Sequence, residues 1–171
     1  DEDNAQDLGQ QAISSEGFTR LFRGAVGALF NKRFLTHGRA RYSFGQGFWD
    51  EWFLEFEDGS TAWITEDNHE LALQRPVESH VPGFDSMSMG QRLVVADKSF
   101  QVLEKGEAKC VGVEGDLPRL VGVEESFQYV DGSSPDGLYA LGIEYGASDT
   151  RAFTGRWVRH DALHLDAEHQ S

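Results

Sequence analysis

The stretch from residue 48 to residue 64 constrains this chain most, because it places tryptophan-rich segments on both sides of an Asp-Gly turn. Between residues 52 and 57, apolar and acidic side chains alternate, and a period of two is typical of a half-buried β-strand. Asp58-Gly59 predicts a hairpin turn into a second strand that contains Trp63. The expected buried face holds Trp52, Leu54 and Phe56, and the opposite face holds Glu51, Glu55 and Glu57.

The rest of the chain also predicts a mainly β protein with little helix. Its 19 glycines supply turns between short apolar runs, which is typical of small barrels or sandwiches. We expect two packed small β modules of this barrel- or sandwich-like kind, at residues 18–75 and 90–165. Residues 76–89 form a linker between them, because their prolines interrupt regular structure. Residues 1–17 form an acidic N-terminal segment, and residues 166–171 form a tail.

Similar elements in the two predicted modules indicate a duplication. Residues 24–34 resemble residues 90–100, and residues 52–56 resemble residues 139–143. A module of about 60–75 residues has a small core, so we expect the two to pack as one cooperative unit. The side chains expected to be mostly buried are Trp52, Leu54, Phe56, Trp63, Leu141 and Ile143.

The single cysteine, Cys110, excludes an internal disulfide and a thiolate zinc site built by this chain alone. It lies in an apolar run, so we expect a buried structural thiol rather than a nucleophile. The sequence has no long apolar run and no signal-peptide pattern, so we expect no transmembrane segment and a cytoplasmic location. No motif indicates a cofactor.

The net charge of -14 is unevenly distributed along the chain. Residues 17–49 hold six bases and no acid, whereas residues 50–70 hold eight acids and no base. One interpretation is neutralisation between neighbouring strands, and the other is a basic surface for an anionic partner. The overall negative charge argues against duplex nucleic acid as a partner, because the two would repel each other at long range.

Five short motifs together resemble a known family: Trp49-Asp50-Glu51-Trp52, Asp58-Gly59 followed by Trp63-Ile64, Glu114-Gly115-Asp116-Leu117-Pro118, Ile143-Glu144-Tyr145, and Phe153-Thr154-Gly155-Arg156-Trp157-Val158. Over residues 21–165 the chain resembles the bacterial domain of unknown function 4178 family. Relatives often carry a cysteine-rich zinc ribbon before this domain, and this sequence contains none. The family has no established activity to transfer, although its relatives suggest an accessory subunit of a membrane-associated stress-response assembly.

Histidines near the C-terminal end form the one pattern that resembles a metal site. A helix over residues 161–168 would place His160 and His164 on one face, with His169 further along. The metalloprotease pattern needs a glutamate after the first histidine, and Asp161 stands there instead. We therefore expect an exposed segment and no metal. The only other helix is expected near residues 4–16.

Acidic residues around a glycine form a second candidate site. Glu114 and Asp116 flank Gly115, and with Glu144 they are candidates for a divalent-cation site or an acid/base pair. The competing interpretation is a turn in which Asp116 hydrogen-bonds its own backbone. A carboxylate-based, metal-assisted or acid/base hydrolase is therefore the alternative function, and it requires these carboxylates to converge in one pocket.

The favoured function is a non-enzymatic binding or adaptor domain whose partner is another protein. Its expected surface combines the aromatic residues Phe48, Trp49 and Phe53 with Arg39 and Arg41. By strand alternation, the two arginines project away from their neighbouring apolar residues, and Phe53 projects away from the hairpin core. Exposed aromatic side chains beside arginines are typical of interface hot spots.

Overall fold

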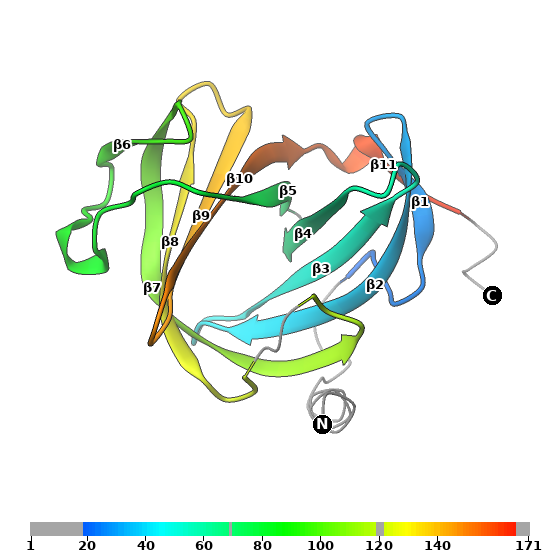
Figure 1. The fold of residues 1–171 in the computed structure, drawn as a ribbon, viewed down its shortest axis with the longest axis horizontal. Helices are drawn as coiled ribbons and strands as arrows, with labels where there is room; N and C mark the ends of the chain where they lie inside the picture. Colours follow the sequence, from blue (N-terminus) through cyan, green and yellow to red (C-terminus); the bar gives the residue numbers. More distant parts are fainter. Residues whose placement is uncertain (1–18, 69, 119–121, 167–171) are drawn as a thin grey trace.

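The computed structural model describes residues 19–68, 70–118 and 122–166, which form eleven strands and two short 3-10 helices (Figure 1). These residues confirm the prediction of a mainly β protein. The strands are β1 (Val26–Leu29), β2 (Lys32–Ser43), β3 (Phe48–Phe56), β4 (Thr61–Asp67), β5 (Glu70–Val77), β6 (Arg92–Val95), β7 (Lys98–Gly115), β8 (Ser126–Ser133), β9 (Tyr139–Tyr145), β10 (Thr150–Val158) and β11 (Leu163–Leu165). The 3-10 helices are η1 (Phe84–Ser86) and η2 (His160–Ala162).

All eleven strands belong to one antiparallel sheet, in the order β11-β1-β2-β3-β4-β5-β10-β9-β8-β7-β6. The strand β2 pairs with β3 along one edge and with β7 along the other. The pairings that run from β2 through β5 and β10 to β7 therefore return to β2. This closed cycle gives its eight strands an inner and an outer face.

The predicted tryptophan hairpin is confirmed. The strands β3 and β4 pair in register, with Trp52 opposite Ile64 and Phe53 opposite Trp63. In the turn, the Ser60 backbone N–H donates a hydrogen bond of 2.9 Å to Asp58. This local bond explains why an Asp-Gly pair forms the turn here.

The two halves of the sheet have the same strand order. One half has the order β1-β2-β3-β4-β5, and the other half has the order β6-β7-β8-β9-β10. The two halves meet where β5 pairs with β10. Each half begins with a hairpin whose two turn residues have positive φ, Phe30-Asn31 in one and Ala96-Asp97 in the other. Two such residues match the right-handed twist of the flanking strands.

Backbone hydrogen bonds next to these hairpins also match. Gly24 N donates to Thr36 O at 2.9 Å, and Gly90 N donates to Val102 O at 2.9 Å. The predicted similarity of residues 24–34 and 90–100 thus corresponds to equivalent places in the two halves. The predicted similarity of residues 52–56 and 139–143 does not correspond to equivalent places, because these residues lie in β3 and β9. The strand order instead makes β3 equivalent to β8, and β4 equivalent to β9.

Three clusters of buried side chains stabilise the sheet. One packs against the outer face of β3 and β4 and includes Trp52, Leu54 and Ile64, together with Leu163 of β11. A second includes Phe100 and Ile143, and a third joins β2, β3, β7 and β8. The six side chains expected to be buried are buried: Trp52, Leu54, Phe56, Trp63, Leu141 and Ile143.

Two predictions about local structure are wrong. The segment expected as a helix over residues 161–168 contains part of η2 and the strand β11, which pairs with β1. The predicted linker begins too early, because β5 continues through Pro76, whose register partner on β10 is Phe153. The helix expected near residues 4–16 lies outside the described residues. Within the described part of the chain, no helix is both long and apolar enough to span a membrane.

Candidate functional site

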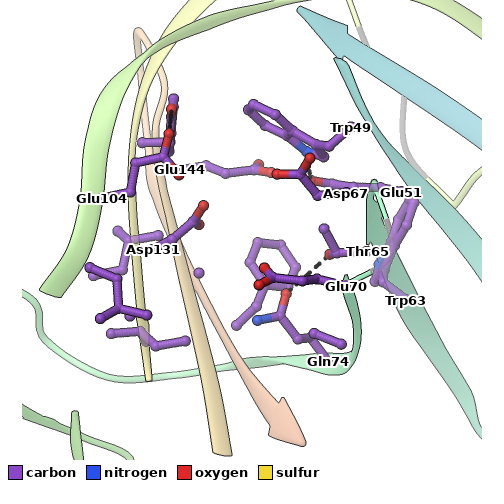
Figure 2. A pocket seen from close by; sticks show the side chains of 18 of the residues that line it. Trp49, Glu51, Trp63, Thr65, Asp67, Glu70, Gln74, Glu104, Asp131 and Glu144 are labelled. Carbon is purple, nitrogen blue, oxygen red and sulfur yellow. Dashed lines mark hydrogen bonds between the residues drawn. The ribbon is translucent and has the colours of Figure 1, made fainter. Parts of the chain in front are cut away.

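A cavity of about 120 Å³ lies inside the closed cycle of strands. Its walls come from β3, β4 and β5 on one side and from β7, β8, β9 and β10 on the other (Figure 2). Because strand side chains alternate, the strands that bury Trp52 and Ile64 on the outer face turn Glu51 and Thr65 inward. The face that sequence alternation identified as polar is therefore partly the wall of a cavity rather than open surface.

Acidic side chains dominate the polar part of this cavity. Figure 2 shows Glu104, Asp131 and Glu144 projecting from one wall toward acids of the opposite wall. No Lys, Arg or His is among the described residues that line it. The carboxyl groups are those of Glu51, Asp67, Glu70, Glu104, Asp131 and Glu144.

Burial and mutual repulsion favour the protonated form of two of these acids. Burial, followed by the neighbouring charges of Glu104 and Asp67, raises the pKa of Asp131 to about 8. Burial, followed by the charges of Glu104 and Glu70, raises the pKa of Asp67 to about 6. Removing a carboxylate from water without a positive partner disfavours its charged form. No base among the described lining residues is therefore placed to neutralise Asp67 or Asp131.

Aromatic donors hold two of the other acids in place. The Tyr129 hydroxyl donates a hydrogen bond of 2.8 Å to Glu104, and Trp49 Nε1 donates one of 3.1 Å to Glu51. Burial and the bond with Glu104 raise the pKa of Tyr129, so its hydroxyl stays protonated. Each of these aromatic side chains thus contributes a ring to the cavity wall and orients the carboxylate to which it donates a hydrogen bond.

Aromatic rings form much of the remaining wall. Trp49 packs against Tyr129 with ring centroids 5.1 Å apart, and Trp63 packs against Phe53 at 5.2 Å. Rings held in this way can present their negative faces to a cation. The aromatic side chains that line the cavity are Trp49, Trp63, Tyr129, Phe153 and Trp157.

One neutral polar group also lines the cavity. Gln74 of β5 is buried, and its Oε1 accepts a hydrogen bond of 3.3 Å from the Thr65 hydroxyl (Figure 2). Across from it, Gly142 of β9 leaves space that a side chain would otherwise occupy. A Cβ placed there would lie 3.6 Å from Gln74 Nε2 and 3.9 Å from Asp131 Oδ1.

The three acids proposed for a hydrolase do not line one cavity. Glu144 lines the cavity, whereas Glu114 pairs with Arg39, whose Nε lies 2.9 Å from its Oε1. Asp116 is exposed beyond the end of β7. Among the described residues, no group of three or more His, Cys, Asp or Glu is arranged to hold a metal ion.

The proposed docking surface is not formed as expected. Arg39 and Arg41 are buried, so the prediction that they face a partner is wrong. Alternation does separate them from Ala40 and Tyr42, but β2 is covered on both faces. Arg41 forms two hydrogen bonds with Asp50, of 2.8 and 3.0 Å. These contacts favour the interpretation that the basic residues of β2 neutralise acids on neighbouring strands.

The aromatic members of that surface are also separated. Trp49 is buried and lines the cavity, and Phe53 is partly buried. Of Phe48, Trp49 and Phe53, only Phe48 is exposed, with 39% of its surface accessible to solvent. Arg41 lies over the Phe48 ring, 5.7 Å from its centroid.

The histidines expected at the C-terminal end are distributed over different elements. His160 belongs to η2, where its carbonyl accepts a hydrogen bond of 2.8 Å from Arg20. His164 is exposed in β11, and His169 lies outside the described residues. Cys110 is buried, as expected, and its thiol donates to Gly112 O at 3.4 Å.

Sequence reasoning missed Asp67, Glu104 and Asp131 as site residues. Asp131 follows Tyr129 and Val130, which are both buried. An acid within an apolar strand segment is the local sequence signal that could have indicated this site residue. Which strand face encloses the cavity depends on the β2–β7 and β5–β10 pairings, and alternation alone does not indicate these pairings.

Comparison with known families covers most of the chain. The family described as "Domain of unknown function (DUF4178)" matches residues 23–160. The chain belongs to this family. The cavity of this DUF4178 domain lies wholly within the matched range. No curated protein and no solved structure matches the chain.

Proposed function

We propose that this DUF4178 domain is a binding domain that takes up a small organic cation in its acidic, aromatic cavity. The observation that carries the proposal is the enclosure of Asp131 beside Asp67 and Glu104, without a base among the described lining residues. A bound cation would supply the missing positive charge. Its favourable interaction with the ionised acids would then lower their raised pKa values.

The aromatic wall supports an organic cation over an inorganic one. A cation over the face of Trp or Tyr gains about 0.5–2 kcal/mol, and alkyl groups gain further from burial against apolar rings. Trp63 is buried and packs on Phe53, and Trp49 packs on Tyr129. The cavity wall thus contains both acids and aromatic rings. This combination suits a ligand that has a positively charged group and a short apolar part.

The volume of the cavity sets the ligand size. A cavity of about 150 Å³ accommodates benzene, which has about six non-hydrogen atoms. The cavity here is about 120 Å³. We therefore propose an ammonium compound of roughly five non-hydrogen atoms, for which n-butylammonium is a suitable probe.

Calorimetric titration at pH 8 with n-butylammonium, and with butyrate as an anion of similar size, tests the proposal. We expect heat of binding and a raised melting temperature with n-butylammonium only, because binding to the folded state stabilises it. The variant Asp131→Asn should weaken binding about tenfold or more, since hydrogen bonds to charged groups contribute about 1.5–3 kcal/mol. The exposed Asp116→Asn is the matched control and should bind as the parent does.

A second variant tests the location of the site. Gly142→Val adds a side chain beside Gln74 and Asp131, and the first added atom meets both at ordinary contact distances. We expect a folded protein without n-butylammonium binding. Unchanged binding in this variant, or equal binding of butyrate, would refute the proposal.

A role in protein–protein interaction stays a second proposal, supported by the exposed ring of Phe48. We further propose that the two halves of the sheet are a duplicated pair of packed β modules. The shared strand order and the matching hairpins support this history. Neither proposal depends on the cavity.

A further inference from the structure

The cavity is lined by a side-chain amide, that of Gln74, whose N–H groups have no acceptor among the described residues. Gln74 is only 9% exposed, and the Thr65 hydroxyl donates to its Oε1. That bond orients the amide and leaves both N–H groups of Nε2 without a partner among the described residues. An amide N–H that faces a cavity takes its acceptor from water or from a ligand.

The position of Gln74 is rigid. Its strand β5 is paired on both sides, with Trp63 as its register partner on β4 and Gly155 on β10. Gly155 permits this close pairing, because a Cβ there would lie only 1.7 Å from Leu73 O. The amide is therefore held in place before any ligand enters.

Gln74 and Asp131 flank the same empty position. A Cβ added at Gly142 would lie 3.5 Å from Gln74 Oε1, 3.6 Å from Gln74 Nε2 and 3.9 Å from Asp131 Oδ1. The Gln74 amide and the Asp131 carboxyl group thus both lie near this position on the cavity wall. A ligand that bonds to both groups must therefore be short.

We propose that the ligand is an amino alcohol or a similar compound, with an ammonium group bound by Asp131 and a neutral oxygen acceptor bound by Gln74. This inference rests on the proposed function and makes it more specific. A ligand carboxylate is a poor acceptor here, because it would meet Glu104, Asp67 and Glu144. A hydroxyl or carbonyl oxygen satisfies Nε2 without adding negative charge.

A purely alkyl ammonium would bind less well. It would displace water from Nε2 without replacing the acceptor that the water provides. Sites that hydrogen-bond a ligand group discriminate against analogues that lack this group, because their own buried polar atoms are left unpaired. The preference is therefore a property of Gln74 and not of the acids.

The test compares 3-amino-1-propanol with n-butylammonium, which have similar size and are both cations at neutral pH. Calorimetric titration should show that 3-amino-1-propanol binds the full chain about tenfold more tightly, the equivalent of one hydrogen bond. In Gln74→Leu the preference should disappear while n-butylammonium still binds. Retained n-butylammonium binding also shows that the variant is folded.

A second pair of variants separates positioning from bulk effects. Thr65→Val removes the hydroxyl that orients Gln74 and should reduce the preference for 3-amino-1-propanol. Thr61→Val changes an exposed threonine of the same strand and should leave it intact. Equal affinity of the two amines in the parent protein would overturn the amino-alcohol proposal alone. Failure of both amines to bind would overturn it together with the proposed function.

Discussion

Asp131 of β8 and Glu104 of β7 are register partners, so two carboxyl groups lie directly opposite each other on neighbouring strands. Like charges in this position destabilise a sheet. The charge of Glu104 adds to burial in raising the pKa of Asp131 to about 8. This repulsion lies inside a cavity rather than on the surface, which supports the proposal of a ligand-binding site there.

The raised pKa of Asp131 predicts a stability that falls with pH. The folded protein holds this proton up to about pH 8, whereas the unfolded chain loses it near the ordinary value of 3.8. The free energy of unfolding should therefore decrease as pH rises from about 4 to 8. Asp131→Asn should remove part of this decrease and stabilise the protein at pH 8 by about 1–3 kcal/mol.

Urea denaturation of the parent and of Asp131→Asn at several pH values measures this effect. Asp116→Asn removes an exposed carboxylate and controls for the change in net charge. If the difference between the parent and Asp131→Asn is the same at pH 5 and pH 8, Asp131 does not titrate as described.

The buried pair of Arg41 and Asp50 predicts a large loss of stability when one partner is removed. Arg41→Ala leaves Asp50 buried with Arg39 as its remaining base, at 3.6 Å. We expect the free energy of unfolding to fall by about 3–5 kcal/mol, as for other broken buried pairs. Lys32→Ala breaks the exposed pair with Asp58 and should cost less than about 1 kcal/mol. Similar losses for the two variants would contradict this prediction.

Glu66 predicts a sensitivity to a nearly isosteric change. Its Oε1 accepts hydrogen bonds from Thr19 and Trp52, and its Oε2 accepts one from the Arg20 backbone N–H. In Glu66→Gln the amide nitrogen would face a donor in either orientation. We expect a loss of about 1–3 kcal/mol in thermal or urea unfolding. The exposed Glu57→Gln is the control, and an equally small effect of both would show that Glu66 is not constrained in this way.

The pairing of the two halves predicts that they unfold together. The outer core of β3 and β4 includes Val158 and Leu163, which come from the other half of the chain. Residues 18–75 alone would also expose the edges of β2 and β5 that pair with β7 and β10. We expect this fragment to be unfolded by circular dichroism, and residues 19–166 to unfold in one transition. A fragment of residues 18–75 with a cooperative thermal transition would disprove this dependence.

Local sequence patterns predicted the parts of the fold that depend on neighbouring residues. The alternation of residues 52–57 identified β3 and its buried face, and Asp58-Gly59 identified the turn. The similarity of residues 24–34 and 90–100 identified equivalent hairpins. The wrong predictions arose where long-range pairing decides the structure, as in β11, which forms because β1 pairs with it.

The sequence by itself thus determined the mainly β class, the tryptophan hairpin and the buried face of residues 52–56, because these follow from side-chain alternation and turn chemistry. Only the tertiary structure decided that the opposite face would enclose a cavity. The closing pairs join residues far apart in the chain, such as Arg39 with Glu114 and Gln74 with Gly155. Closure converts acids such as Asp131 from apparent surface residues into the wall of a site, since the burial that raises their pKa values exists only in the closed sheet.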